Sequence, residues 1–129
     1  MDVKTFYEQM GVDYNNVLRR LCSEQLILKY LGKLPTDPTY RLLTDAFAAG
    51  DAETAFRAAH TLKGLCLNLD LRPLLEESDA LTERLRAQTP LRELQGELDR
   101  LSEEYHRLTQ RIEALLSGAE KGESDHAGA

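Results

Sequence analysis

The sequence predicts an all-α protein, an up-and-down antiparallel four-helix bundle preceded by short N-terminal helices. Apolar residues recur at helical spacing along most of the chain, and neither an alternating strand pattern nor a hairpin turn signal interrupts them. The links between the helical stretches are short, which favours antiparallel neighbours. With 129 residues, the chain is expected to form one domain over residues 1–116, with the core bundle at about 36–116.

Three short helices are expected before the bundle. The first should cover residues 2–10 and end at Gly11, because glycine readily takes the left-handed conformation that closes a helix. Asp13 and Ser23 are N-cap candidates for the next two, since their side-chain oxygens can accept hydrogen bonds from a first turn. Pro35 then breaks the helical pattern.

Four longer helices follow, and each has a recognisable start. Asp51 is the expected N-cap of the second, and Glu53 favours the positive end of that helix. Pro73 fits the first turn of the third, and Pro90 fits the first position of the fourth. These helices are expected at residues 38–49, 51–69, 72–87 and 90–116.

The fourth of these helices has the clearest period in the sequence. Its apolar residues alternate steps of three and four over about 40 Å of helix. We expect this stripe to close the protein's own bundle, giving a monomer, and residues 117–129 to be a flexible polar tail. An intermolecular coiled coil, which would make the protein a dimerising adaptor, stays open as the alternative. The stripe consists of Leu91, Leu94, Leu98, Leu101, Tyr105, Leu108, Ile112 and Leu115.

Composition and charge argue against several classes of partner and cellular location. The net charge of -6, without a basic stripe, argues against nucleic acid and anionic membranes as partners, because both require phosphate-neutralising Lys and Arg. The N-terminus lacks a signal-peptide pattern, and no apolar run approaches the ~20 residues that span a bilayer. We therefore expect a cytoplasmic protein. Cys22 and Cys66 are expected to be buried free thiols.

Most other polar candidates suggest no chemistry. His106 and His126 are expected to be solvated, and together with His60 they have no metal-ligand spacing, so no metal site is expected. The acidic run Glu76, Glu77 and Asp79 is interpreted as a solvated helix face.

The segment AAHTLKGLCLNLDL, residues 58–71, differs from these. On a helical wheel of residues 52–69, the core stripe is complete without His60, which falls on the opposite side. An exposed imidazole is nucleophilic near neutral pH, and an ammonium one turn away could offset the charge of a phosphoryl group on it. The core stripe is Ala55, Ala58, Leu62, Leu65, Cys66 and Leu69. The histidine side carries Glu53, Phe56, Arg57, Lys63, Gly64 and Leu67.

Two features of that side suggest a docking surface. Gly64 costs about 1 kcal/mol in a helix interior relative to alanine, and its missing side chain leaves space beside the histidine. Phe56 and Leu67 are apolar residues grouped around a polar one.

The stretch GDAETAFRAAHTLKG, residues 50–64, resembles the phosphoacceptor helix of histidine-containing phosphotransfer (HPt) domains. The family motif of histidine, any residue, leucine, lysine and glycine is met by His60, Leu62, Lys63 and Gly64. Asn68 fits the usual continuation.

The resemblance implies a phosphorelay carrier of two-component signalling, an intermediate rather than an autonomous catalyst. His60 would accept a phosphoryl group from, or donate it to, an aspartate of a response-regulator receiver domain or a hybrid sensor histidine kinase. Lys63 would stabilise the phosphoryl charge, and Gly64, with the other residues of its face and Asn68, would admit the receiver. The receiver would supply Mg2+, so no cofactor is expected on this chain, which would act as a stand-alone carrier.

One position departs from the family pattern. A second glycine often stands ten residues after the histidine, where this chain has Asp70. At ~1.5 Å per residue Asp70 lies about 15 Å along the helix from His60, too far to touch a phosphoryl group. Because this departure from the family pattern is present, a phosphate-independent adaptor that binds receivers or other proteins stays open as the alternative function.

Overall fold

The computed structural model describes the backbone of residues 1–128 and the side chains of residues 1–118. Every regular element in this part of the chain is a helix, as the sequence predicted. The chain divides into two compact units, one made of Met1–Thr36 with the chain from Arg107 onward, the other of Asp37–His106.

The first unit opens with three short helices, of which the second and third start at the predicted caps, Asp13 and Ser23, and the first at Asp2, for which no cap was predicted. The carboxylates of Asp2 and Asp13 accept hydrogen bonds from the N–H groups of Thr5 (2.8 Å) and Asn15 (3.0 Å). The Ser23 hydroxyl accepts one from Leu26 N–H at 3.1 Å. Gly11, with φ +74°, follows the first helix as expected. The elements are α1 (Val3–Gln9), α2 (Tyr14–Leu21), α3 (Glu24–Lys33) and the 3-10 turn η1 (Leu34–Thr36), which contains Pro35.

Aromatic side chains form part of the core of this unit. The rings of Phe6 and Tyr7 are fully buried and meet edge to face at 5.3 Å. Arg111 lies against them: its guanidinium is 5.3 Å from the Phe6 ring and donates to the Gln9 side chain at 2.6 Å. Cys22 is exposed, so the expectation of a buried thiol was wrong there. It is the left-handed C-cap of α2, with φ +74°, and so lies outside the helix face that packs inward.

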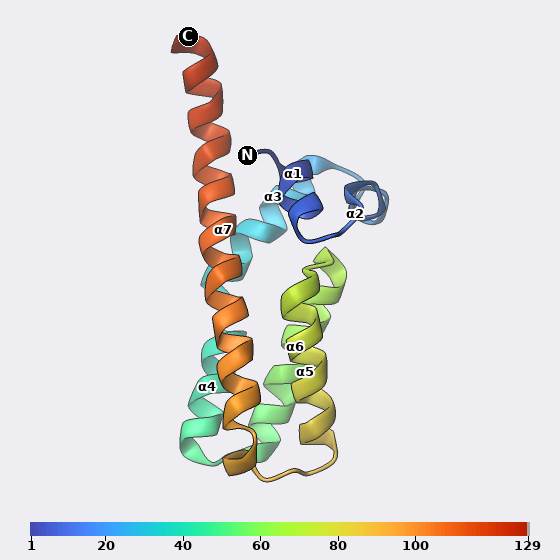
Figure 1. Cartoon of the computed structure of the whole chain (residues 1–129), viewed down its shortest axis with the longest axis vertical. Coiled ribbons are helices and arrows are strands. Elements are labelled where there is room, and N and C mark those ends of the chain that lie inside the picture. The colour runs from blue at the N-terminus through green and yellow to red at the C-terminus, as the bar shows by residue number, and fades with distance from the viewer. Residues whose placement is uncertain (129) are drawn as a thin grey trace. The chain divides into compact units, whose positions relative to one another are not determined.

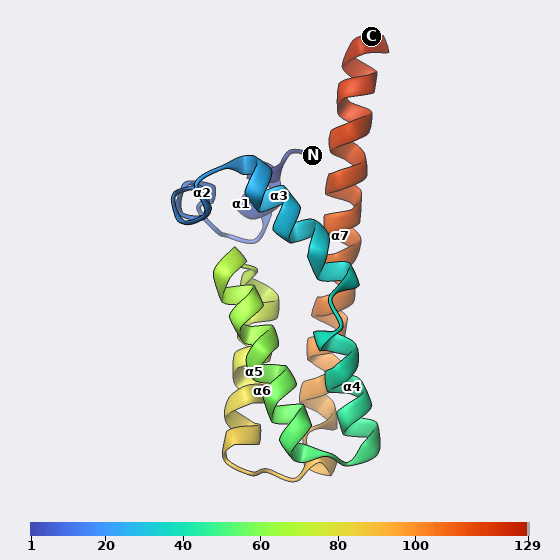
Figure 2. The same cartoon turned by 180° about the vertical axis from the view of Figure 1, so that it is seen from behind.

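The second unit contains α4 (Thr39–Ala49), α5 (Ala52–Leu69), α6 (Arg72–Arg86), the 3-10 turn η2 (Leu91–Glu93) and the first part of α7 (Gln95–Gly128). Helix α5 packs against both α4 and α6, and in Figures 1 and 2 α5 and α6 run side by side. Gly50, with φ +70°, ends α4, and Pro73 stands in the first turn of α6, both as predicted.

The start of the last helix differs from the prediction. Pro90 was expected at the first helical position, but its ψ of 139° is extended, and a 3-10 turn follows before α7 begins at Gln95. Gln88 takes a positive φ of 63° just before it. The chain therefore changes direction at residues 88–90 and reaches helical geometry only after the turn.

The apolar stripe of α7 is buried within the chain. Seven of its eight residues, all but the half-buried Leu91 in η2, have at most 7% of their surface exposed. Helix α7 runs to Gly128, beyond the predicted end at Leu116. The side chains after Gly118 lie outside those described, so the polar tail, with His126 in it, stays a prediction.

A ring stacking, a hydrogen bond and an ion pair join α7 to its neighbours in this unit. The Tyr40 ring of α4 stacks on Tyr105 with centroids 3.9 Å apart, and its hydroxyl donates to Ser102 at 2.8 Å. On the other side, Arg100 lies 3.8 Å from the Glu77 carboxylate of α6. The acidic run of α6 is therefore not simply a solvated face, because Glu77 takes part in helix packing.

Candidate functional site

The site begins with the cap that starts α5. The Asp51 carboxylate accepts hydrogen bonds from the backbone N–H of Thr54 at 3.1 Å and from its hydroxyl at 2.6 Å. These bonds from Thr54 lower the pKa of Asp51 below its ordinary value. They satisfy N–H groups of the first turn and so mark where α5 begins.

His60 is exposed on α5, opposite the buried face, as the helical wheel predicted. The buried face differs from the predicted stripe at two positions: Leu65 is only half-buried, and Ala59 is fully buried. A small residue such as Ala59 can pack at the edge of the stripe because α5 has helices on two sides, which a wheel for one isolated helix does not include. The buried residues are Ala55, Ala58, Ala59, Leu62, Cys66 and Leu69.

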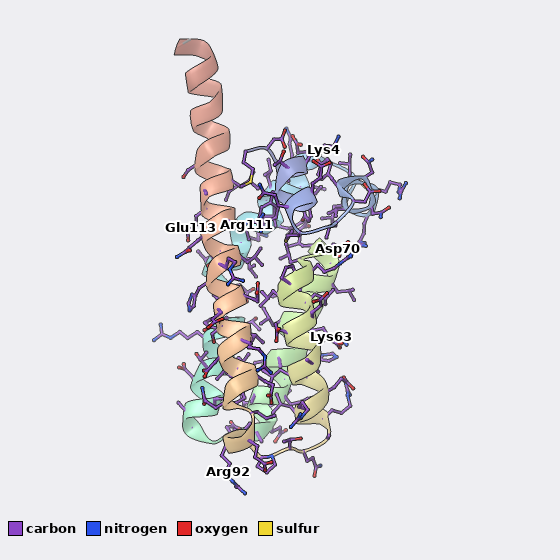
Figure 3. All side chains as sticks on the ribbon, in the orientation of Figure 1. Lys4, Lys63, Asp70, Arg92, Arg111 and Glu113 are labelled. Carbon is purple, nitrogen blue, oxygen red and sulfur yellow. The ribbon has the colours of Figure 1, made fainter. Side chains whose placement is uncertain are left out.

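Lys63 is not free on the histidine face. Its ammonium nitrogen lies 2.8 Å from Oδ1 of Asp79 on α6, and only 30% of its side chain is exposed. Figure 3 labels Lys63 beside the α5–α6 pair. Asp79 is half exposed, but it is not simply solvated, because α6 lies against α5 and brings that carboxylate to the lysine. The spacing of residues along the sequence carries no signal for this pairing.

Phe56 lies one turn before His60, with the two ring centroids 6.0 Å apart and tilted by 33°. The Arg86 guanidinium of α6 is 5.2 Å from the Phe56 ring, within cation–π range. Beside them is an open pocket of about 660 Å³. The pocket is lined by Ala52, Glu53, Phe56, Leu85, Arg86, Gln88, Thr89 and Pro90.

The remaining predicted docking residues are all accessible. A Cβ added at Gly64 would meet nothing within 4 Å, so the space predicted beside the histidine exists. Leu67 is 57% exposed, Asn68 is exposed, and Arg57 lies 3.8 Å from Glu53 on the outer surface of α5.

Leu42 of α4 is a further exposed apolar residue of this unit, and it was missed from the sequence. It is 50% exposed and lines a shallow pocket with Arg57, Ala58 and Thr61 of α5. Its neighbour Leu43 is fully buried, so the two adjacent leucines lie on different faces of α4.

A family model described as Hpt domain matches residues 36–118. The chain belongs to this family. No curated protein and no solved structure matches it. Hpt domains act in phosphotransfer within two-component signalling, where they interact with receiver domains and kinases. The matched region contains the whole histidine face and leaves α1, α2 and α3 outside it.

The residue that departs from the Hpt pattern has a clear structural position. Asp70 is the C-cap of α5 in the left-handed conformation, with φ +51° and ψ +48° (Figure 3). Its N–H bonds to the Leu67 carbonyl, and the following N–H, of Leu71, bonds to that of Cys66. A glycine would take this conformation at lower cost. In this chain the position where the family often has a second glycine is thus the end of α5.

Two further features, a metal-binding cluster and a membrane-spanning helix, are absent from the described residues. No group of three or more His, Cys, Asp or Glu side chains among the described residues is arranged to bind a metal ion. None of the helices within that part of the chain is long and apolar enough to cross a membrane.

Proposed function

We propose that this Hpt domain protein is a phosphorelay carrier that accepts a phosphoryl group on His60 and passes it on. The observation that carries the proposal is the exposed imidazole on α5, with open space at Gly64 and the Lys63 ammonium one turn away. These three residues match the motif by which α5 resembles the phosphoacceptor helix of the family, and they lie within the matched region.

The reaction is a transfer between histidine and aspartate. An unprotonated ring nitrogen of His60 attacks the phosphorus of an aspartyl phosphate, the N–P bond forms, and the bond from phosphorus to the aspartate oxygen breaks. The aspartate leaves as a carboxylate, and the ring keeps the proton on its other nitrogen or releases it to solvent. The receiver supplies Mg2+ and its acidic residues, so the reaction belongs to the complex rather than to an autonomous enzyme.

The residues around His60 would form the docking surface. Phe56 and Leu67 supply apolar contact, and the absence of a side chain at Gly64 lets the partner approach. Glu53, Arg57 and Asn68 would make polar contacts at the rim. The proposed partners are response-regulator receiver domains, a hybrid sensor histidine kinase, or both.

The finer features of the fold belong to the same proposal. Helices α4, α5, α6 and α7 would form an up-and-down antiparallel bundle within a monomeric domain of residues 1–116. The proposed compartment is the cytoplasm, where the phosphorylated receivers of such relays act. Two observations support the bundle. Helix α5 packs against α4 and α6, and α7 contacts the same two helices.

Phosphoryl transfer from a panel of phosphorylated receiver domains tests the function. The wild-type protein should acquire an acid-labile, base-stable label, and His60→Gln should acquire none. His60→Gln should keep its free energy of unfolding within about 0.5 kcal/mol of wild type, because the side chain is exposed.

His106→Gln is the matched control, since it removes another exposed helical histidine and should leave the label intact. Receivers that bind the wild-type protein without labelling it would contradict the carrier and favour the phosphate-independent adaptor. Label retained by His60→Gln would place the acceptor on another residue.

A further inference from the structure

The ion pair between Lys63 and Asp79 joins the proposed phosphate-stabilising residue to a neighbouring helix. The distance of 2.8 Å between Nζ and Oδ1 is that of a charge-assisted hydrogen bond. The lysine side chain is 30% exposed and the aspartate 51%, so the pair lies partly out of water. In the unphosphorylated protein the ammonium is therefore already neutralised by a carboxylate.

Phosphorylation of His60 would create a competitor for that ammonium. A phosphoryl group carries about two negative charges near neutral pH, more than a carboxylate. Lys63 lies one turn from His60, so its flexible arm can reach either anion. If it moves to the phosphoryl group, Asp79 loses its partner; if it stays, the phosphoryl charge is offset less.

We propose that Asp79 is a positioning residue that restrains Lys63 and thereby lowers the stability of the phosphorylated form relative to the unphosphorylated one. The inference rests on the proposed function of His60. Its consequence is a carrier that gives up its phosphoryl group readily, because the carboxylate of Asp79 regains the ammonium when the N–P bond breaks and the group returns to a receiver aspartate.

The neighbouring acidic residues do not share this position. Glu77 lies 3.8 Å from Arg100 of α7 and is engaged there. Glu76 is one turn before Asp79 on α6, and within the described residues Lys63 has its ion pair with Asp79 alone. Glu76→Gln therefore removes one negative charge near the site without releasing Lys63.

The equilibrium distribution of label between the protein and a receiver tests the inference. Six forms of the protein are each equilibrated with the same phosphorylated receiver. They are wild type, Asp79→Asn, Asp79→Glu, Glu76→Gln, Lys63→Gln and the double variant Lys63→Gln/Asp79→Asn. Asp79→Asn should raise the ratio of phosphohistidine to aspartyl phosphate about threefold, the size expected for a partly exposed ion pair. Asp79→Glu, which keeps the carboxylate, should restore most of the wild-type ratio, and Glu76→Gln should change it little.

The double variant separates restraint of Lys63 from simple charge repulsion. With Lys63 absent, Asp79→Asn should shift the ratio no more than Glu76→Gln does. An equal threefold shift in that background would overturn the inference, as would an unchanged ratio in the single variant. Both failures leave a labelled wild-type protein and so leave the carrier function standing, whereas a wild-type protein that takes no label from any receiver overturns both.

Discussion

The rings of Phe56 and His60 lie 6.0 Å apart on successive turns of α5, and the Arg86 guanidinium of α6 lies 5.2 Å from the Phe56 ring. The exposed histidine thus stands on α5 next to a half-buried aromatic side chain that α6 helps to hold. On the next turn Gly64 leaves the other side of the imidazole open. No side chain at position 64 therefore obstructs this side of His60.

Gly64→Gln should separate stability from docking. Glutamine is a better helix former than glycine by up to about 1 kcal/mol, and the position has open space, so the free energy of unfolding should stay the same or rise. The rate of phosphoryl transfer should fall at least tenfold, because the new side chain occupies the approach to His60. Urea unfolding and single-turnover transfer measure the two effects.

Gly118→Gln is the control, since Gly118 is another helical glycine where an added Cβ would meet nothing within 4 Å, and it lies far along the sequence from the site. It should leave transfer unchanged. Wild-type transfer by Gly64→Gln would remove the steric role assigned to this glycine.

Asp70→Gly and Asp70→Ala should differ in stability and agree in activity. Both remove the carboxylate, which lies 3.5 Å from Arg72, so their difference isolates the left-handed backbone at φ +51°. The glycine variant should be more stable than the alanine variant by about 1 kcal/mol, measured by urea unfolding.

Transfer should be the same in both variants, because Asp70 lies about 15 Å along α5 from His60. A changed receiver preference in either variant would show instead that Asp70 contacts the partner.

The two cysteines should react very differently with a thiol reagent. Burial raises the pKa of Cys66 to about 12, against a smaller opposing effect of a hydrogen bond with Ser78, whereas Cys22 is exposed. Iodoacetamide at pH 8 should therefore alkylate Cys22 and spare Cys66 until the protein unfolds, as mass spectrometry of digests can measure.

The same shift has a consequence for stability. Because the pKa of Cys66 is higher in the folded protein, the folded state holds this proton more tightly than the unfolded chain. The free energy of unfolding should therefore fall as pH rises above about 9, the ordinary value for a thiol. In Cys66→Ala the fall in the free energy of unfolding that comes from this thiol should disappear. Alkylation of Cys66 in the native protein at pH 8 would contradict its burial.

The protein should be a monomer of 14.6 kDa by light scattering after size exclusion, at all concentrations tested. The apolar stripe of α7 is covered within the chain, with Leu94, Leu101 and Ile112 fully buried, so it has no free face for a coiled coil. A stable mass of twice this value would contradict the monomer and support the alternative of a dimerising adaptor.

Local sequence signals determined most of the helices. Asp13, Ser23 and Asp51 were identified as caps because each can satisfy first-turn N–H groups without help from distant residues. The exposure of His60 likewise followed from the period of one helix. The start of α7 was not determined locally, because a proline such as Pro90 suits both a first helical turn and an extended link.

What the sequence by itself determined, then, was an all-helical chain with an imidazole, an ammonium and a glycine on one outward face of α5. What only the tertiary structure decided was the partner of that ammonium, the Asp79 carboxylate of α6. The physical reason is that helical period specifies which residues of one helix share a face, whereas contacts between helices depend on how their faces are set against each other. For the same reason Phe56 could be predicted beside His60, but Arg86 against its ring could not.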